Sequence, residues 1–400
     1  MRVIYLHQFF NTLEMSGSTR SFEIARRMVA AGHGVDIVTS FQEPTSRSGW
    51  FTTNEAGINV HWLPVKYSNR MSYPSRVLAF FKFAIRAAAR ARHIRGDVVF
   101  ATSTPLTIAI PGAYAARRRR IPMVFEVRDL WPDVPIAIGA LKNPLARFAV
   151  RALERFSYYN SAAVIALSPG MAQGILRTGY PRERVTIVPN ASDLELFERK
   201  PSHGREFRAR MGIDERKILV GYLGTLGRLN GVSYLVRIAA ALKNDRRFVF
   251  LTVGDGLECE RVTALARAEG VLDRNFLMLS KVAKLEVPAL LSAVNVATSL
   301  FLPIPQMESN SANKFFDALA AGCCVAINYG GWQAQLLREA GAGIRLDVDP
   351  ERAASELQAL ADEPGRIASA GVNARKLAEE RFSRDELAAK IIAVLTSVLK

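Results

Sequence analysis

Short apolar runs of strand length alternate with helical segments along the chain, and the alternation starts again after about residue 200. In the first half these runs include residues 2–7, 35–39 and 97–101, and each leads to a segment with the apolar spacing of a helix. In the second half they include residues 218–223 and 248–253. Strands that alternate with helices in this way form parallel, doubly wound sheets. The pattern therefore predicts an α/β protein with two such sheets in tandem.

A polar segment at residues 193–203 separates the two halves. Two domains are expected for 400 residues, because single hydrophobic cores rarely grow beyond ~250 residues. We predict an N-terminal domain at residues 1–198, a C-terminal domain at residues 199–383, and a final helix at residues 384–400 that packs back toward the N-terminal domain. Ligands of open α/β sheets bind at the carboxyl ends of the strands, so a site is expected in the cleft between the sheets.

The net charge of +16 is concentrated in the first half, where residues 1–200 hold 27 Lys and Arg against 14 Asp and Glu. A basic surplus of this kind indicates an anionic partner, which leaves a membrane surface, a phosphorylated substrate or nucleic acid. Nucleic acid is suggested by charge alone. The sequence has no helix-turn-helix, zinc-finger or RNA-recognition pattern to support it, so no nucleic-acid partner is expected.

Much of the surplus lies in a basic amphipathic helix predicted over residues 76–95. Its apolar residues are expected to pack on the sheet, and they are Val77, Phe80, Phe81, Ala84, Ile85 and Ala88. Its basic face would then carry Lys82, Arg86 and Arg90. That face is expected either to be simply solvated or to lie on anionic lipid, and the two expectations are compatible.

The compartment is expected to be cytoplasmic. The ten residues at the N-terminus are too short and too soon polar for a signal peptide, and no apolar run reaches the ~18 residues of a membrane span. The three cysteines, Cys259, Cys323 and Cys324, form no cluster with metal-ligand spacing. We therefore expect reduced thiols, no metal site and, with the basic helix, a peripheral position on the inner face of the plasma membrane.

The segment at residues 308–328, ESNSANKFFDALAAGCCVAIN, is the strongest candidate for a binding site. A polar run that contains Ser311, Ala312 and Asn313 opens a helix, and Gly322 ends it before an apolar strand. The N-terminus of a helix offers unpaired N–H groups and the positive end of the helix dipole, which suits phosphate. Asp317, one turn further along, is placed to accept hydrogen bonds from sugar hydroxyls.

Two segments of the N-terminal half could face the same cleft. Ser16 and Gly17 lie just before the first predicted helix, and a glycine there lets the backbone approach an anion closely. The stretch FEVRDLWPD at residues 125–133 ends a strand with the charged residues Glu126, Arg128 and Asp129, at the position where doubly wound folds bind ligands. An ordinary helix cap and a salt-bridged loop are the structural alternatives.

The C-terminal half adds two more segments. GYLGTLGRLNG at residues 221–231 is a strand, a turn with Gly224 and Thr225, and a helix start with Arg228. LSKVAKLEVPALLSAVNV at residues 279–296 places Lys281 and Val282 just after a strand. VGDG at residues 253–256 is not a dinucleotide fingerprint, because Cys259 stands where its third glycine would be.

In combination and order, these motifs resemble the retaining glycosyltransferases of family 4, which have the GT-B fold. RDLWP and NKFFD are similar to the subgroup that builds bacterial surface polysaccharides, including transferases of L-fucosamine and other N-acetylamino sugars. The resemblance covers nearly the whole chain. Many members have a histidine near residue 129, and Asp129 is taken as its substitute. The usual lysine and arginine of the phosphate loop fall on Asn230 and Thr225.

The resemblance implies a role for each of these residues. The donor diphosphate would lie against Ser16, Gly17, Gly224, Thr225 and the backbone of Ser311, Ala312 and Asn313, with Arg228 and Lys314 as its cations. Lys281 and Val282 would border the nucleobase and Asp317 the ribose. The first acid of the family's E-x7-E motif falls on Ser309, with Glu308 one residue away, so whether Glu308 contacts the sugar stays open.

The expected function is the transfer of a sugar, one candidate being an N-acetylated or deoxy-amino sugar, from a nucleotide diphosphate to a lipid-linked saccharide. UDP is the expected nucleotide because it is the commonest in this group, and no metal or other cofactor is expected. The alternative is an epimerase or hydrolase of nucleotide sugars on the same fold. The sequence leaves the linkage formed and the oligomeric state open.

Overall fold

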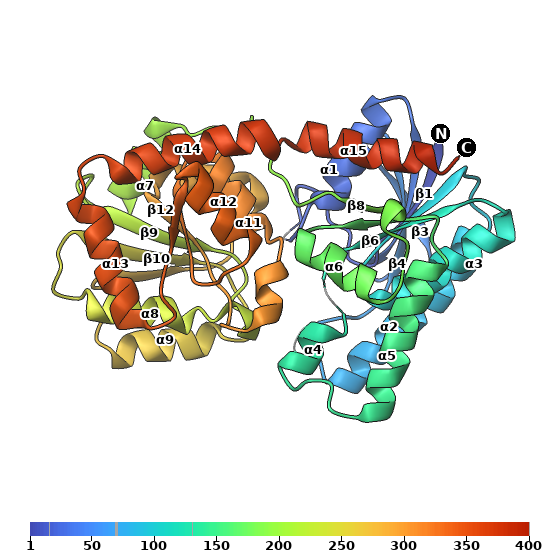
Figure 1. The fold of residues 1–400 in the computed structure, drawn as a ribbon, viewed down its shortest axis with the longest axis horizontal. Coiled ribbons are helices and arrows are strands. Elements are labelled where there is room, and N and C mark those ends of the chain that lie inside the picture. Colours follow the sequence, from blue (N-terminus) through green and yellow to red (C-terminus); the bar gives the residue numbers. More distant parts are fainter. Residues whose placement is uncertain (16, 69–70, 130, 400) are drawn as a thin grey trace.

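The computed structural model describes residues 1–15, 17–68, 71–129 and 131–399, in which the chain forms two α/β domains with one sheet each (Figure 1). The N-terminal sheet has the strand order β3-β4-β2-β1-β5-β6-β7-β8. All its neighbours pair in parallel except β3, which is antiparallel to β4. Its strands are β1 (Arg2–Leu6), β2 (Gly34–Phe41), β3 (Phe51–Glu55), β4 (Ile58–Pro64), β5 (Val98–Thr102), β6 (Met123–Val127), β7 (Ala163–Ala166) and β8 (Val185–Ile187).

Helices cover both faces of this sheet. They are α1 (Arg20–Ala30), α2 (Tyr73–Ala91), α3 (Ala109–Arg119), α4 (Asp133–Ala137), α5 (Pro144–Tyr159) and α6 (Pro169–Arg177), with short 3-10 turns at η1 (Leu106–Ile108) and η2 (Arg182–Arg184). Side chains that alternate along β1 enter two different hydrophobic clusters, with Val3 and Tyr5 in one and Ile4 and Leu6 in the other. A strand buried on both faces in this way is typical of a doubly wound sheet.

The C-terminal sheet is parallel throughout its described pairs, with the order β11-β10-β9-β12-β13-β14. Its strands are β9 (Ile218–Leu223), β10 (Phe248–Val253), β11 (Phe276–Leu279), β12 (Val296–Ser299), β13 (Cys324–Ile327) and β14 (Gly343–Arg345). Around them lie α7 (Pro201–Arg210), α8 (Ser233–Ala241), α9 (Cys259–Ala268), α10 (Val287–Ala293), α11 (Asn313–Ala320), α12 (Trp332–Ala340), α13 (Pro350–Asp362), α14 (Arg366–Arg381), η3 (Arg228–Asn230), η4 (Lys284–Glu286) and η5 (Pro305–Ser309). The predicted α/β class with two doubly wound sheets is confirmed.

The chain crosses between the domains twice, after β8 and after α14. The last helix, α15 (Arg384–Ser397), returns to lie beside α1, and the two are joined by Arg27, whose Nε is 2.5 Å from Asp385 Oδ1 (Figure 1). The first crossing is held by Asp193, which forms ion pairs with Arg27 and with the buried Arg384. These charged contacts hold the first crossing and the start of α15 against α1.

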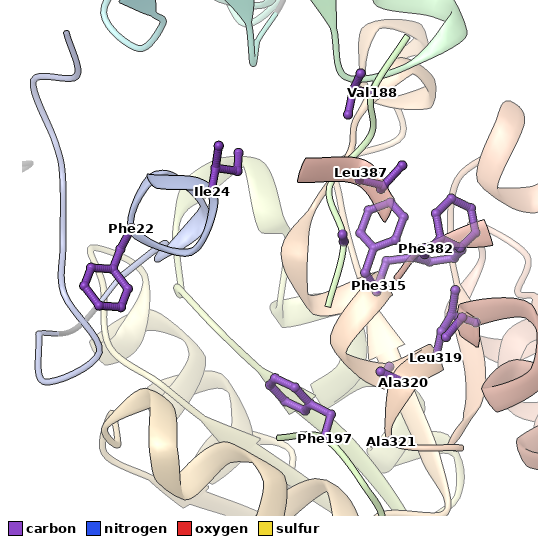
Figure 2. Close-up of a cluster of buried hydrophobic side chains, with 14 of the residues drawn as sticks. Phe22, Ile24, Val188, Phe197, Phe315, Leu319, Ala320, Ala321, Phe382 and Leu387 are labelled. Carbon is purple, nitrogen blue, oxygen red and sulfur yellow. The ribbon is translucent and has the colours of Figure 1, made fainter. Parts of the chain in front are cut away.

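A hydrophobic cluster continues through both crossings to α11. Figure 2 shows Val188 and Phe197 of the first crossing in one cluster with Phe315 and Leu319 of α11 and with Phe382 and Leu387 of the second. The buried Phe316 also stacks edge-on against Phe382, with ring centroids 5.0 Å apart. The cluster packs against the buried side of α11 and holds this helix in place. The N-terminus of α11 therefore stays at the gap between the two domains.

The prediction for the packed face of α2 is correct for Ala84, which is buried, and wrong for Phe81 and Ile85, which are exposed. The other buried residues of the helix are Ala79, Phe83, Ala87 and Ala91, and Leu78 is exposed beside Phe81. Apolar residues occur on both sides of this helix, and the side rich in alanine packs because small side chains allow a close approach to α3. Arg90 does not belong to the outer face either, since its Nη2 lies 3.0 Å from His61 Nδ1.

Some elements escaped prediction. β3 has a short pattern of exposed and half-buried residues, which gives no apolar run. The predicted linker overlaps the start of α7, whose residues are mostly polar. Of the helices in the described part of the chain, none is long and apolar enough to cross a membrane.

Candidate active site

The carboxyl ends of the two sheets meet at a gap that is closed on one side by contacts between the domains. Ser168, the N-cap of α6, donates to the backbone oxygen of Ser309 at 2.6 Å. The backbone N–H of Asn190 donates to Ser311 Oγ at 3.0 Å, and the Asn190 side chain donates to the Ser311 carbonyl. The loop before α11 is therefore fixed against the N-terminal domain.

The first loop of the N-terminal domain reaches the same place. Gly17 has a φ of +134°, a conformation that side chains rarely adopt, and a Cβ there would lie 2.7 Å from Asn11 Nδ2. The next residue, Ser18, accepts a hydrogen bond from Asn313 Nδ2 at 3.1 Å across the gap. The structure thus brings Gly17 and Asn313 together, as predicted for a phosphate site. Ser16, predicted to join them, lies outside the described residues.

The N-terminus of α11 is arranged as an anion site would need. Ala312 is the N-cap without a side-chain cap, and its N–H donates to Asn310 Oδ1 at 3.1 Å. Asn313 begins the helix, and its side chain points toward Ser18 instead of covering the helix end. The N–H groups of the first turn and the positive end of the helix dipole are therefore presented to the gap.

Lys314 lies beneath the turn that follows β9. Its Nζ donates to Tyr222 Oη at 2.8 Å and stands over the Tyr222 and Phe301 rings. Burial lowers the pKa of Lys314 to about 7. Since no ion pair neutralises this ammonium among the described residues, a bound anion would be its natural counter-charge.

The turn after β9 brings Gly224 and Asn230 onto the same lysine. Gly224 has a φ of +154°, and a Cβ there would lie 3.3 Å from Lys314 Cε. In the amide orientation that satisfies both polar atoms of Asn230, its oxygen accepts from Lys314 Nζ at 3.0 Å and its nitrogen donates to the Thr225 carbonyl at 2.9 Å. The loop has asparagine instead of lysine at residue 230, and the ammonium of Lys314 lies next to this asparagine. Arg228 is exposed in η3, next to this turn.

Asp317 is buried and has protein partners on both oxygens. Its Oδ1 accepts from Ser192 Oγ at 3.0 Å, and its Oδ2 is 2.5 Å from Lys284 Nζ. A carboxylate has about four acceptor positions, so two remain for ribose hydroxyls. Lys284 belongs to η4, which follows the loop with Lys281 and Val282, the predicted border of the nucleobase. Lys281 is exposed and Val282 is half-buried.

The other two predicted residues lie elsewhere around the gap. Asp129 is exposed at the end of β6 and accepts from Thr104 Oγ1 at 3.2 Å. Glu308 is exposed in η5, where its Oε1 would lie 2.8 Å from a Cβ on Gly330. It lines a groove of about 910 Å³ that also includes Gly170 and Trp332. No contact with the N-terminus of α11 is recorded for either carboxylate within the described ranges.

Prediction from the sequence missed Tyr222 and gave Arg128 no role in the site. Arg128 lies in the FEVRDLWPD stretch next to Asp129, and its Nη2 donates to Ser18 Oγ at 3.0 Å. The charged end of a strand was a signal for this stretch, but it did not distinguish Arg128 from Asp129. Tyr222 lies inside β9, and nothing in a strand pattern indicates that its hydroxyl meets Lys314.

Comparisons with known proteins bear on the family and the fold of this chain. Residues 17–191 match the family model of the glycosyl transferase 4-like domain. The chain is 26% identical over 192 residues to the 2-deoxystreptamine glucosyltransferase of Streptomyces kanamyceticus, and the match covers 47% of each chain. The chain therefore spans about half the length of this curated relative.

Solved structures match nearly the whole chain. The Anabaena protein Alr3699/HepE in complex with UDP-glucose superposes with a TM-score of 0.75 at 17% identity, over 99% of this chain and 100% of that one. WaaG, a glycosyltransferase involved in lipopolysaccharide biosynthesis, has a TM-score of 0.71 at 18% identity, over 98% of this chain and 99% of its own. At these identities the likeness establishes the fold, which is GT-B.

Proposed function

We propose that this chain is a family 4 glycosyltransferase of the GT-B fold and that it transfers a sugar from a UDP-sugar to a lipid-linked saccharide with retention of configuration. The observation that carries the proposal is the meeting of Lys314, the N-terminus of α11 and the turn at Gly224. A half-buried ammonium that has no carboxylate partner among the described residues, a helix N-terminus and a glycine turn together form a site for a diphosphate.

The proposed chemistry separates a sugar from its diphosphate. The bond between the anomeric carbon and the phosphate oxygen breaks, and the electron pair stays on the phosphate. A bond forms from the acceptor oxygen to the anomeric carbon on the same face, and the acceptor proton passes to a phosphate oxygen of the leaving group. Lys314, Arg228 and the N–H groups at Asn313 would stabilise the negative charge that builds up. None of these steps calls for a metal ion.

Uridine is proposed as the base because a solved structure with this fold holds UDP-glucose. In a thermal-shift panel of UDP-, GDP- and ADP-sugars, the UDP-sugars are expected to raise the melting temperature most, since a ligand that binds only the folded state stabilises it. A stabilisation of about 2.7 kcal/mol is expected at a hundred times the dissociation constant. A larger shift with GDP- or ADP-sugars would contradict the choice of uridine.

A lipid-linked acceptor is proposed from the outer face of α2. Leu78 and Ile85 are 70% and 67% exposed, and Phe81 lies on the same face together with the exposed Lys82 and Arg86. Exposed apolar side chains mixed with basic ones suit the surface of an anionic bilayer, where the apolar groups enter the headgroup region. We therefore propose a peripheral position at the inner face of the plasma membrane. An epimerase or hydrolase of free nucleotide sugars would have no use for this face.

The protein is expected to sediment with liposomes that contain anionic lipid. Lys82→Glu with Arg86→Glu should weaken binding by roughly tenfold to a hundredfold, because each basic residue near an anionic leaflet contributes about 1 kcal/mol. Leu78→Ser with Phe81→Ser and Ile85→Ser should weaken the binding that persists at high salt, since salt screens charge and leaves apolar contacts intact.

Val372→Ser is the matched control, because Val372 is 69% exposed on α14 of the other domain. It should bind liposomes like the unaltered protein. If the unaltered protein stays in the supernatant with anionic liposomes at low ionic strength, the membrane proposal fails and a soluble acceptor is favoured.

A further inference from the structure

Arg128 places a positive charge at the gap from the side of the N-terminal domain. It follows the carboxyl end of β6, and its backbone N–H donates to Ser103 Oγ at 3.0 Å. Its guanidinium has two partners: Nη1 lies 3.2 Å from His7 Nε2, and Nη2 donates to Ser18 Oγ at 3.0 Å. A guanidinium has five N–H donors, so most of them remain free for a ligand.

The carboxylates near Arg128 are occupied by other groups. Glu126 is fully buried, with Oε1 2.8 Å from Arg20 Nη2 and Oε2 accepting from Thr102 Oγ1 at 2.5 Å. Asp129 accepts from Thr104. Among the residues that the structure describes, no Asp or Glu forms an ion pair with Arg128. Burial alone would raise the pKa of Glu126, but the charge of Arg20, followed by that of Arg128, lowers it, so Arg128 acts on this carboxylate at a distance and without a direct ion pair.

His7 contacts the guanidinium of Arg128 through Nε2. The side chain is buried, and burial, followed by the charge of Arg128, lowers the pKa of His7 well below its ordinary value. The imidazole is therefore neutral, and Nε2 can accept from Arg128 while the proton is on Nδ1. Among the described residues, Nδ1 is buried without a hydrogen-bond partner, so Nε2 makes the one contact of this ring that the structure records with a charged side chain.

Ser18 connects Arg128 to the predicted phosphate site. Its Oγ accepts from Arg128 on one side and from Asn313 Nδ2, at 3.1 Å, on the other. Asn313 is the first residue of α11, and the next residue is Lys314. Arg128 and Lys314 therefore approach the N-terminus of one helix from opposite domains.

We propose that Arg128 donates hydrogen bonds to the diphosphate of the bound nucleotide sugar and that His7 positions it. The inference rests on the proposed function, because it assigns a further residue to the same site. When the bond from the anomeric carbon to the phosphate oxygen breaks, the electron pair remains on the diphosphate. The negative charge of the diphosphate therefore increases by one unit. Arg128 stabilises that charge without losing a proton, and only while the two domains are closed on each other.

Isothermal titration of three probes tests the proposal: UDP, UMP and uridine. Arg128→Met should weaken UDP binding by tenfold or more and leave uridine binding unchanged, because uridine has no phosphate. Turnover should fall by about a hundredfold, as for the loss of one donor to a developing oxyanion. Arg182→Met, the control, removes one exposed arginine from the same domain and should change neither.

His7 is tested by a double-mutant cycle. His7→Ala should weaken UDP binding less than Arg128→Met, and it should have no further effect in the Arg128→Met background, because it acts through the guanidinium. A purely structural role for His7 would give additive losses, and that result would overturn its positioning role.

The outcomes separate this inference from the proposed function. If the unaltered protein binds UDP and Arg128→Met binds it equally well with unchanged turnover, the role of Arg128 is overturned and the donor site stands. If Arg128→Met raises only the KM for the acceptor, the residue serves the acceptor and the inference is also overturned. If the unaltered protein does not bind UDP, the proposed donor fails, and this inference fails with it.

Discussion

Replacing Lys314 with methionine is expected to lower turnover by about a hundredfold to a thousandfold, the loss measured when one donor to a developing oxyanion is removed. The ammonium lies under the Gly224 turn with Tyr222 and Asn230 as its partners. Nucleoside binding should change much less, because the charge acts on the leaving diphosphate.

The same variant is expected to be more stable than the unaltered protein when no ligand is present. Burial lowers the pKa of Lys314 to about 7, whereas an unfolded lysine titrates near 10.4. Between these pH values the unfolded state binds more protons, so the free energy of unfolding rises with pH in the unaltered protein. The advantage of Lys314→Met should therefore be largest at and below pH 7 and should shrink toward pH 10. Thermal unfolding at several pH values measures it.

A rescue separates a chemical role from a structural one. Asn230→Lys in the Lys314→Ala background should recover part of the turnover, because Asn230 already contacts the lysine that would be removed. Lys243 is exposed just after the end of α8, and no contact with the Gly224 turn is recorded for it within the described ranges, so Lys243→Met serves as the charge control. Full turnover in the double variant Arg228→Ala/Lys314→Ala would contradict the assignment of these cations.

Asp317→Asn is expected to weaken UDP binding by roughly tenfold or more, because a hydrogen bond to a charged group contributes about 1.5–3 kcal/mol. The loss should be much smaller for 2′,3′-dideoxy-UDP, which lacks the hydroxyls that the carboxylate would accept from. Titration calorimetry with both nucleotides measures the difference. Equal losses for the two nucleotides, or none, would mean that Asp317 does not bind ribose.

The pairing of Asp317 with Lys284 requires a control, because the carboxylate also joins the first crossing to η4. Lys284→Met leaves Asp317 buried without its cation and should destabilise the protein by a few kcal/mol. If Asp317 binds ribose, this variant should still distinguish UDP from the dideoxy nucleotide. If Lys284→Met loses stability and also no longer distinguishes UDP from the dideoxy nucleotide, the role of Asp317 is limited to the interdomain contact.

The fold was largely predictable, because alternating strands and helices are local patterns. β1 and β9 end at glycine- or serine-containing loops, and the N-terminus of α11 was recognisable from its polar run and the stop at Gly322. The face of α2 was not predictable, because Phe81 and Phe83 are both apolar and only the packing against α3 decides which of them is buried. An edge strand such as β3 lacks the apolar run on which the prediction depends.

The segments that form the site could be predicted from the sequence, but the contacts between their side chains could not. The approach of Lys314 to Asn230, or of Asn313 to Ser18, joins residues far apart in the chain and depends on how the domains close. The sequence raised the idea that Lys314 replaces a missing lysine, and the structure adds the contact that makes it testable. Arg128 was recognised as a strand-end residue but received no role, because its neighbour Asp129 was as polar and as well placed along the chain.

Release of UDP in the presence and absence of an acceptor tests the central proposal most directly. The purified protein is incubated with a UDP-sugar that it binds, with and without a bacterial lipid extract that contains lipid-linked saccharides. A transferase is expected to release UDP only with the extract and to place the labelled sugar in the lipid fraction. Equal release of nucleotide without any acceptor, and no label in the lipid, would contradict the account and favour an epimerase or hydrolase.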